Sequence, residues 1–427
     1  MLAALGVVVG AVVNLAIDRL AWHPRRRSPW GPRPEGAAAR RWFDRVPIAG
    51  WLGMRRESST HGALFWLRPM LLEVCCAVGL PLLYWWEIVH AALLPPVLPA
   101  PAVPMVLVIL HQQYIAHVLL LMLMLTASMI DVDEKIIPDT ITVPGTLAGL
   151  LLATLWPHSL PPAWVIPAEV SLDGGFWQLF VDAGGEWPIL HAAAPNDWPA
   201  WLDGRPHGWS LAIALACWWA WSLALLPRRL HTRHGYCRAW ALLLARLRRQ
   251  PETYATLIGG LIGSVLILLV WLADGGGSGL LPVRAWQGLL TALSGLAAGG
   301  GIIWTVRIVG TATLRREAMG FGDVTLMAMI GTFVGWQSCL VIFFLAPVAG
   351  LIVGVIQLAL SRGPEIPYGP FLCLATIVTL VAWSPIWDWG WPIFSMGWTL
   401  AAILAACMAL MALMLGLWMT LRDALGI

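Results

Sequence analysis

The sequence has few charged residues. Only 11% of its 427 residues are Asp, Glu, Lys or Arg, against roughly 25% in soluble domains, and 59% are hydrophobic. The mean hydropathy is +0.76. This composition excludes a water-soluble globule. Apolar stretches recur along the whole chain and predict an all-α, polytopic helical membrane protein surrounded by a lipid bilayer.

Several chemical motifs are missing as well. None of the seven cysteines has C-x-x-C spacing, so neither a zinc framework nor a disulfide framework is indicated. The sequence has no glycine-rich loop followed by lysine for phosphate and no G-x-S-x-G nucleophile. A single lysine, Lys135, accompanies the arginines, and the net charge is only +3. No nucleic-acid partner is therefore predicted.

The apolar stretches predict about eleven transmembrane helices, within a range of 8 to 11. The first is predicted to be a retained span and not a cleaved signal peptide, because it lacks a basic leader and a small-residue cleavage motif. His111 and His117 lie on different faces of their helix, which favours interhelical hydrogen bonding over metal binding. The predicted spans are 2–20, 70–86, 105–130, 141–157, 208–227, 255–273, 286–309, 324–335, 338–360, 370–386 and 397–420.

The distribution of charge predicts the orientation of these spans. Segment 23–69 carries ten arginines against three acids, and segment 228–252 carries seven against one, so both are predicted to be cytoplasmic. The loop 158–207 contains six acids and one arginine and is predicted to lie outside. Alternation along the chain then puts three short polar segments on the cytoplasmic side, namely 131–140, 310–323 and 361–369.

Two acidic segments are candidates for chemistry because acids at the mouth of a membrane helix are costly. Asp131 ends a long apolar stretch, and Asp323 opens another directly after Gly320 and Gly322. The glycines would permit close backbone approach and unusual dihedral angles. The alternative is structural: such acids end or cap helices, and Asp139 is placed to cap a helix that begins at Ile141. If Asp131 and Asp323 meet, they can share a proton, as in aspartic proteases.

Six blocks in the expected order resemble the type IV prepilin leader peptidases, the GxGD-type bacterial aspartic proteases. By this resemblance Asp131 and Asp323 are the catalytic pair, Gly320 and Gly322 shape the second site, and Asp139 is the second choice for the first acid. The blocks are Gly10 to Arg19, Arg41 to Leu52, Pro69 to Glu73, Ile130-Asp131 with Pro138-Asp139, Gly320 to Val324, and Ile366 to Phe371.

The resemblance implies a bacterial inner-membrane enzyme that cuts at the cytoplasmic face. Its substrates and partners would be type IV prepilins or type II secretion pseudopilins, which carry a short basic leader and a hydrophobic helix. Cleavage would require no cofactor, and S-adenosylmethionine would be needed only if the methylation of the new amino terminus is retained. The alternative is a non-proteolytic divergent paralogue that acts as a membrane scaffold or a proton-linked transporter.

The resemblance also divides the chain into four predicted parts. Residues 1–157 form an N-terminal membrane part with the first catalytic Asp, and 158–284 an inserted segment with two extra helices and an outer loop. Residues 285–386 form the C-terminal catalytic part, and 387–427 an extra terminal helix. The insertion separates the two acids by 192 positions (323 minus 131). An even number of extra helices keeps both acids on one side of the membrane.

Two further features depart from the family pattern. Many members carry two C-x-x-C pairs in the first loop, consistent with a structural zinc site. Here the corresponding positions are Arg27, Trp30, Ser58 and His61, so no zinc is expected, and His61 is interpreted as a solvated loop residue. Thr325 replaces a common lysine, and Lys135 is a candidate to supply that charge from across the site.

Overall fold

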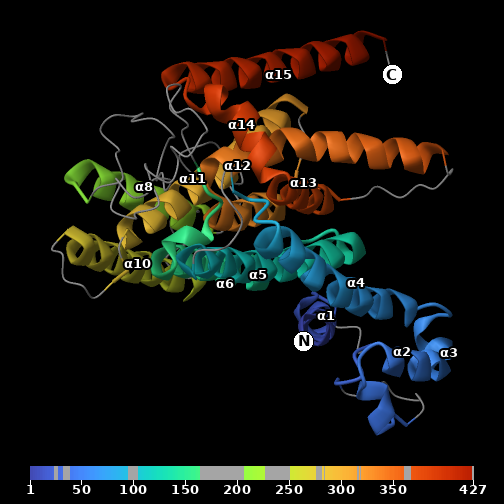
Figure 1. Ribbon diagram of the computed structural model, residues 1–427. Coiled ribbons are helices and arrows are strands. Elements are labelled where there is room, and N and C mark those ends of the chain that lie inside the picture. The colour runs from blue at the N-terminus through green and yellow to red at the C-terminus, as the bar shows by residue number, and fades with distance from the viewer. Residues whose placement is uncertain are drawn as a thin grey trace.

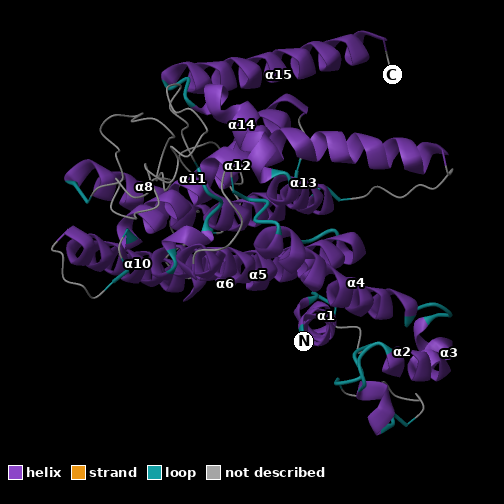
Figure 2. Ribbon diagram, viewed as in Figure 1, coloured by secondary structure: helices purple, strands orange, loops and turns teal. Residues whose placement is uncertain are grey.

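The fold of the protein was analysed in a computed structural model that describes residues 1–23, 27–31, 39–94, 104–163, 206–226, 251–275, 281–282, 284–314, 317, 319–359 and 367–425. Within these ranges the regular structure is entirely helical, as Figures 1 and 2 show. The predicted all-α class is therefore confirmed. The outer loop predicted at 158–207 and the basic loop at 228–252 lie mostly outside the described residues.

The helices of the described part follow the apolar stretches closely. The chain runs through α1 (Leu2–Leu20), α2 (Ala49–Gly53), α3 (Ser58–His61), α4 (Leu67–Tyr84), α5 (Pro104–Glu134), α6 (Asp139–Leu155), α8 (Gly208–Ala224), α10 (Pro251–Gly275), α11 (Ala285–Leu314), α12 (Phe321–Ala359), α13 (Gly369–Val381), α14 (Trp383–Phe394) and α15 (Trp398–Leu425). A π-helical turn, Trp85–Val89, extends α4.

Seven helices of the described part are long and apolar enough to cross a membrane, and the bent pair α13–α14 makes an eighth. The count is lower than the predicted eleven for two reasons. Element α12 contains two helices that meet at a kink at Gly335 (φ 78°), in agreement with the two predicted spans 324–335 and 338–360, but it counts once here. In addition, α6 and α8 are apolar helices of only 17 residues each.

The main hydrophobic core lies between α5, α6, α12 and α13. It includes Leu120, Ile330 and Leu372, all of them fully buried. On the next face of the molecule, α11 crosses α12 at glycines, where a Cβ built on Gly295 would lie 2.0 Å from the carbonyl oxygen of Gly331. Such contacts let two membrane helices approach to backbone distance.

The two helices of the predicted insertion are integral to this bundle. The α8 residue Trp218 donates a hydrogen bond to the carbonyl of Gly260 on α10 at 2.8 Å. Trp286 of α11 donates to the hydroxyl of Ser210 on α8 at 3.2 Å. Thus α8 and α10 pack against the centre of the molecule and do not form a separate lobe.

At the other side of the bundle, α4 lies antiparallel to α5. Near one end Arg68 pairs with Asp133 at 2.6 Å, and further along α4 the ring of Tyr84 packs edge-on against Tyr114. His117 hydrogen-bonds through Nδ1 to the buried Glu87 at 2.7 Å. This bond, together with that between His111 and Tyr84, confirms the predicted interhelical role of the two histidines.

The terminal helix α15 contacts α11 but buries little of its own surface. Only 6% of the most apolar stretch of α15 is buried inside the protein. Figure 1 shows this helix along one border of the bundle. Before it, the chain bends by 95° between α13 and α14. The predicted extra terminal helix is therefore present, and most of its surface faces outward.

Candidate functional site

The first candidate acid, Asp131, lies in the last turn of α5. Its side chain is only 4% exposed, and its backbone carbonyl accepts a hydrogen bond from the amide of Lys135 at 2.7 Å. Lys135 has a left-handed backbone (φ 56°), which ends α5 and turns the chain toward Ile137. The local sequence thus places a buried carboxylate at the end of an apolar helix.

The second candidate acid, Asp323, lies in the first turn of α12 and is 8% exposed. A carboxylate at this position is stabilised by the helix dipole. Two residues later, the hydroxyl of Thr325 donates to the carbonyl of Gly322 at 3.0 Å. Thr325 is therefore buried in the same first turn. That Lys135 supplies the positive charge of the lysine that Thr325 replaces stays a prediction.

The structure brings these two acids together. The carboxylate charges of Asp131 and Asp323 interact electrostatically, although 192 positions separate them (323 minus 131). Contact between α12 and the turn after α5 positions them, because a Cβ on Gly322 would lie 2.9 Å from Cβ of Ile137. The close backbone approach that the glycines predict is confirmed at Gly322.

The glycines do not adopt the unusual dihedral angles that the sequence also suggested. Neither Gly320 nor Gly322 has a positive φ, so that expectation is wrong. Their contribution here is space. The backbone amide of Gly320 faces the Asp323 carboxylate, and a Cβ on Gly320 would lie 3.5 Å from Oδ2 of that acid.

The start of α13 supplies a third wall that sequence reasoning did not assign to the site. The backbone amide of Gly369 faces the Asp131 carboxylate, and a Cβ on Gly369 would lie 2.5 Å from Oδ2 of Asp131. Next to it, burial raises the pKa of Tyr368 to about 12, and the charge of Asp323 adds to the rise. Both residues belong to the block from Ile366 to Phe371, so a signal for them was present in the sequence.

Asp139, the second choice for the first acid, lies outside the buried pair. Its side chain is exposed, in the first turn of α6. The predicted cap at Asp139 is wrong in register, because α6 begins at Asp139 itself and Pro138 occupies the N-cap. Proline at that position has an extended backbone and starts the helix two residues earlier than predicted.

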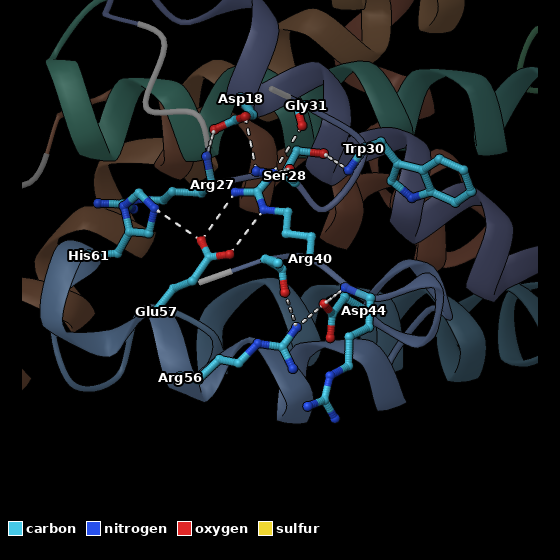
Figure 3. Close-up of polar contacts among 12 residues, drawn as sticks. Asp18, Arg27, Ser28, Trp30, Gly31, Arg40, Asp44, Arg56, Glu57 and His61 are labelled. Carbon is cyan, nitrogen blue, oxygen red and sulfur yellow. Dashed lines mark hydrogen bonds and ion pairs between the residues drawn. The ribbon is translucent and has the colours of Figure 1, made fainter. Parts of the chain in front are cut away.

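The loop between α1 and α4 contains a buried polar cluster, shown in Figure 3. The guanidinium of Arg40 donates to both carboxylate oxygens of Glu57, at 3.0 and 3.2 Å, and to the carbonyls of Ser28 and Gly31. His61 lies 3.6 Å from Glu57, and its side chain is 9% exposed. The interpretation of His61 as a solvated residue is therefore wrong, because the ion pair and the ring of Phe65 cover it.

Three acids next to the site already have partners within the protein. Glu134 accepts hydrogen bonds from the backbone amides of Trp22 and His23, and Asp133 pairs with Arg68. Glu73, which is 2% exposed, accepts from the side chains of Asn14 and Trp51 at 3.0 and 2.9 Å. It also accepts from the amide of Ile48. These bonds fasten the loop to α1, α4 and α5 next to Asp131.

Fold and site together define a polytopic helical membrane protein with two buried carboxylates at helix ends. Residues 214–355 match the type IV leader peptidase family. The matched segment contains Asp323 but not Asp131, and it begins inside the predicted insertion 158–284.

Curated relatives agree with this match. The prepilin leader peptidase/N-methyltransferase of Pseudomonas aeruginosa is 35% identical over 127 residues, 28% of this chain and 42% of the relative. The protein of that name from Stutzerimonas stutzeri is 31% identical over 121 residues, 28% of this chain and 40% of the relative. The one from Escherichia coli is 28% identical over 191 residues, 43% of this chain and 77% of the relative.

Over these segments the chain is similar to the type IV prepilin leader peptidases. It spans about two fifths of the length of the Stutzerimonas and Pseudomonas aeruginosa relatives. No solved structure gives a significant match to it.

Proposed function

We propose that the protein is a membrane aspartic endopeptidase that removes the leader of type IV prepilins or type II secretion pseudopilins. Cleavage takes place at the cytoplasmic face of the bacterial inner membrane. The observation that supports this proposal most directly is the meeting of Asp131 and Asp323, both buried and far apart in sequence. The names of the relatives give the substrate class.

The two carboxylates share one proton, because like charges at short range do not both ionise cheaply. The ionised carboxylate takes a proton from water while the water oxygen forms a bond to the scissile carbonyl carbon. The protonated partner polarises the carbonyl oxygen in this step. The carbon–nitrogen bond then breaks, and the amine leaves with a proton from the dyad.

The position of the dyad selects where a substrate is cut. Asp131 ends a membrane helix and Asp323 begins another, so the scissile bond must lie where a substrate helix leaves the bilayer. The amides of Gly369 and Gly320 hold the two carboxylates in place from the backbone. Backbone donors of this kind need no side-chain rearrangement during the reaction.

A zinc ion does not fit the loop between α1 and α4. The residues at the corresponding positions are Arg27, Trp30, Ser58 and His61, and only His61 is a common zinc ligand. Its imidazole faces Glu57, which is already held by Arg40. We therefore derive no step through a metal, and propose that the ion pairs hold this loop.

Methylation of the new amino terminus with S-adenosylmethionine stays a prediction. The relatives are named prepilin leader peptidase/N-methyltransferase. Mass spectrometry of the product amino terminus tests for a methyl group.

The test is co-expression of the full chain with a prepilin, followed by the gel shift that reports leader removal. We expect Asp131→Asn and Asp323→Asn each to lower cleavage by at least 1,000-fold. Asp139→Asn, which changes an exposed acid, is the matched control and should retain cleavage. Normal cleavage by both dyad variants would contradict the mechanism and favour a scaffold or a proton-linked transporter.

A further inference from the structure

Arg307 is a charged residue within the apolar helix α11, and its side chain reaches the turn that precedes Asp323. It lies seven residues before the end of α11, about 10 Å at 1.5 Å per residue. The side chain is partly buried. A charge within a membrane helix costs free energy, so the contacts of this arginine require an explanation.

Three contacts hold the guanidinium of Arg307 against the segment between α11 and α12. Its Nε donates a hydrogen bond to the carbonyl oxygen of Met319 at 2.9 Å. Its central carbon lies 5.6 Å from the centre of the Phe321 ring, within the range of a cation–π interaction. Its Nη2 lies 3.6 Å from Oε1 of Glu317, whose side chain is 82% exposed. Such an exposed ion pair contributes little, so the contacts with Met319 and Phe321 fix the arginine.

The carbonyl that accepts this hydrogen bond belongs to the same peptide group as the amide of Gly320. That amide faces the carboxylate of Asp323. A peptide group is planar, and in the usual trans form its C=O and N–H bonds point in opposite directions. Arg307 and Asp323 are therefore connected through one rigid unit, with the guanidinium on its oxygen side and the carboxylate on its N–H side.

This connection acts on the carboxylate in two ways. The hydrogen bond from Arg307 fixes the plane of the peptide, and with it the direction in which the Gly320 amide points. It also polarises the peptide, because hydrogen bonds in a chain strengthen one another. Glycine has more conformational freedom than other residues, so the turn at Gly320 depends on such an outside contact to keep one conformation.

We propose that Arg307 is a positioning residue for the cleavage reaction, which holds the Gly320 amide against the carboxylate of Asp323 through the peptide between Met319 and Gly320. The inference rests on the proposed function and adds to it a residue that sequence reasoning did not assign to the site. Arg307 acts through the peptide and does not touch the substrate. The competing explanation is purely structural: the arginine would only fasten α11 to the following turn.

Arg307→Met keeps an apolar stem and removes every donor. It should lower kcat for prepilin cleavage by about 30-fold with KM unchanged, because a charge-assisted hydrogen bond that supports the reacting carboxylate is lost. The acidic limb of the pH–rate profile should move toward higher pH, because the Gly320 amide then donates less well to the ionised carboxylate. Glu317→Gln is the matched control: it removes the exposed partner of the same arginine and should keep the wild-type rate and profile.

Arg307→Lys separates positioning from charge. Lysine keeps the positive charge but lacks the planar group that donates to Met319 while it packs on Phe321. It should recover only part of the kcat that Arg307→Met loses, with a pH–rate profile between those of the methionine variant and the wild type. A lysine variant with the wild-type kcat and profile would overturn the inference, because charge alone would then be sufficient.

The two proposals fail in different ways. If the wild-type chain cleaves no prepilin, the proposed function is wrong. If the wild type cleaves and Arg307→Met loses thermal stability without any change in kcat or in the pH–rate profile, only the inference is wrong, and the role of the arginine is structural. A higher KM at constant kcat would also overturn it, because Arg307 would then contact the substrate. If Arg307→Met does not fold, the lower kcat and the shifted profile expected for Arg307→Lys decide the question.

Discussion

Glycine residues govern the geometry around the two acids through the space that they leave. At Gly369 the backbone lies against the carboxylate of Asp131, and at Gly322 it lies against Ile137. Neither contact depends on a left-handed backbone. A single methyl group at either position would therefore act on the acids directly, through steric displacement.

Gly369→Ala is expected to lower prepilin cleavage by about 100-fold, because the new Cβ would lie 2.5 Å from Oδ2 of Asp131 and push the carboxylate out of place. A displacement of about 1 Å in a catalytic group lowers the reaction rate by about this factor. The matched control is Gly354→Ala, where the space is open. Steady-state cleavage of detergent-solubilised enzyme measures the effect, and equal rates in the two variants would argue against it.

His158 gives the protein a predicted pH dependence of stability. Burial lowers its pKa from 6.5 to about 4, and the charge of Arg284 acts in the same direction. The unfolded chain therefore binds a proton between pH 6.5 and about 4 that the folded chain does not bind, so stability falls as pH falls through this range.

His158→Gln removes the imidazole that binds this proton in the unfolded chain. The variant should therefore lose less thermal stability than the wild type between pH 7.5 and pH 4.5. Thermal unfolding in detergent at several pH values measures the change. A variant at the exposed His90 is the matched control and should lose stability like the wild type. An identical pH profile for His158→Gln would contradict the assignment.

Sequence reasoning at the residue scale selects positions at which a residue breaks an apolar pattern. Asp131 and Asp323 stand out because an acid at the end of a membrane helix costs free energy, so its presence there requires an explanation. The contributions of Tyr368 and Gly369 could not be derived in this way, because they depend on the packing of α13 against α5. His61 was misjudged for a similar reason: its burial comes from Glu57 and Phe65, which meet it only in the folded loop.

Among the elements, the loop between α1 and α4 is stabilised by a buried ion pair. Arg40 and Glu57 form a pair whose side chains are 8% and 0% exposed, and Arg40 also holds two backbone carbonyls of the preceding segment. Breaking one partner of such a buried pair costs about 3–5 kcal/mol, because the other charge is left uncompensated. The loop is therefore held by charge and hydrogen bonds together.

Arg40→Met is expected to destabilise this loop by about 3–5 kcal/mol. The measurement is limited proteolysis within segment 39–66, which should become at least 100-fold faster because cleavage follows the population of the opened loop. Arg45→Met, at an exposed arginine of the same loop, is the matched control. EDTA should leave the cleavage activity and the proteolysis of the wild type unchanged, and a chelator-induced loss of either would show that a metal contributes.

The helices themselves were predicted well, and their interruptions only in part. Long apolar runs fix where spans begin and end to within a few residues, because the bilayer sets their length. The break at Gly335 was predicted, whereas the 95° bend after α13 and the π-helical turn at Trp85–Val89 were not, because they depend on neighbouring helices. Local hydropathy carries no information about such contacts.

At the scale of the whole molecule, the bundle gathers distant helix ends on one side. The end of α5 and the starts of α12 and α13 meet around the two acids. The far end of α13, 13 residues and about 20 Å away, turns into α14. That these helix ends lie on the cytoplasmic side, as the arginine distribution indicates, stays a prediction.

This arrangement predicts the sidedness of labelling. Cysteines introduced at Ile136 and Glu317, both exposed near the acids, should react with a membrane-impermeant maleimide only from the cytoplasmic side. A cysteine at Trp389, which is 73% exposed on α14, should react only from the opposite side. The background replaces all seven native cysteines with serine. Labelling of Ile136 and Glu317 from opposite sides would contradict the pairing of the acids.

The division of the dyad between α5 and α12 affects how the enzyme is made. A nascent chain that has been translated only through α11 carries Asp131 but not Asp323, and it also lacks Gly369. Under the proposed function, the chain becomes able to hydrolyse a substrate only after the ribosome has synthesised α12 and α13 and these helices have entered the bilayer beside α5. Incomplete products released by stalled translation would be unable to attack other membrane proteins.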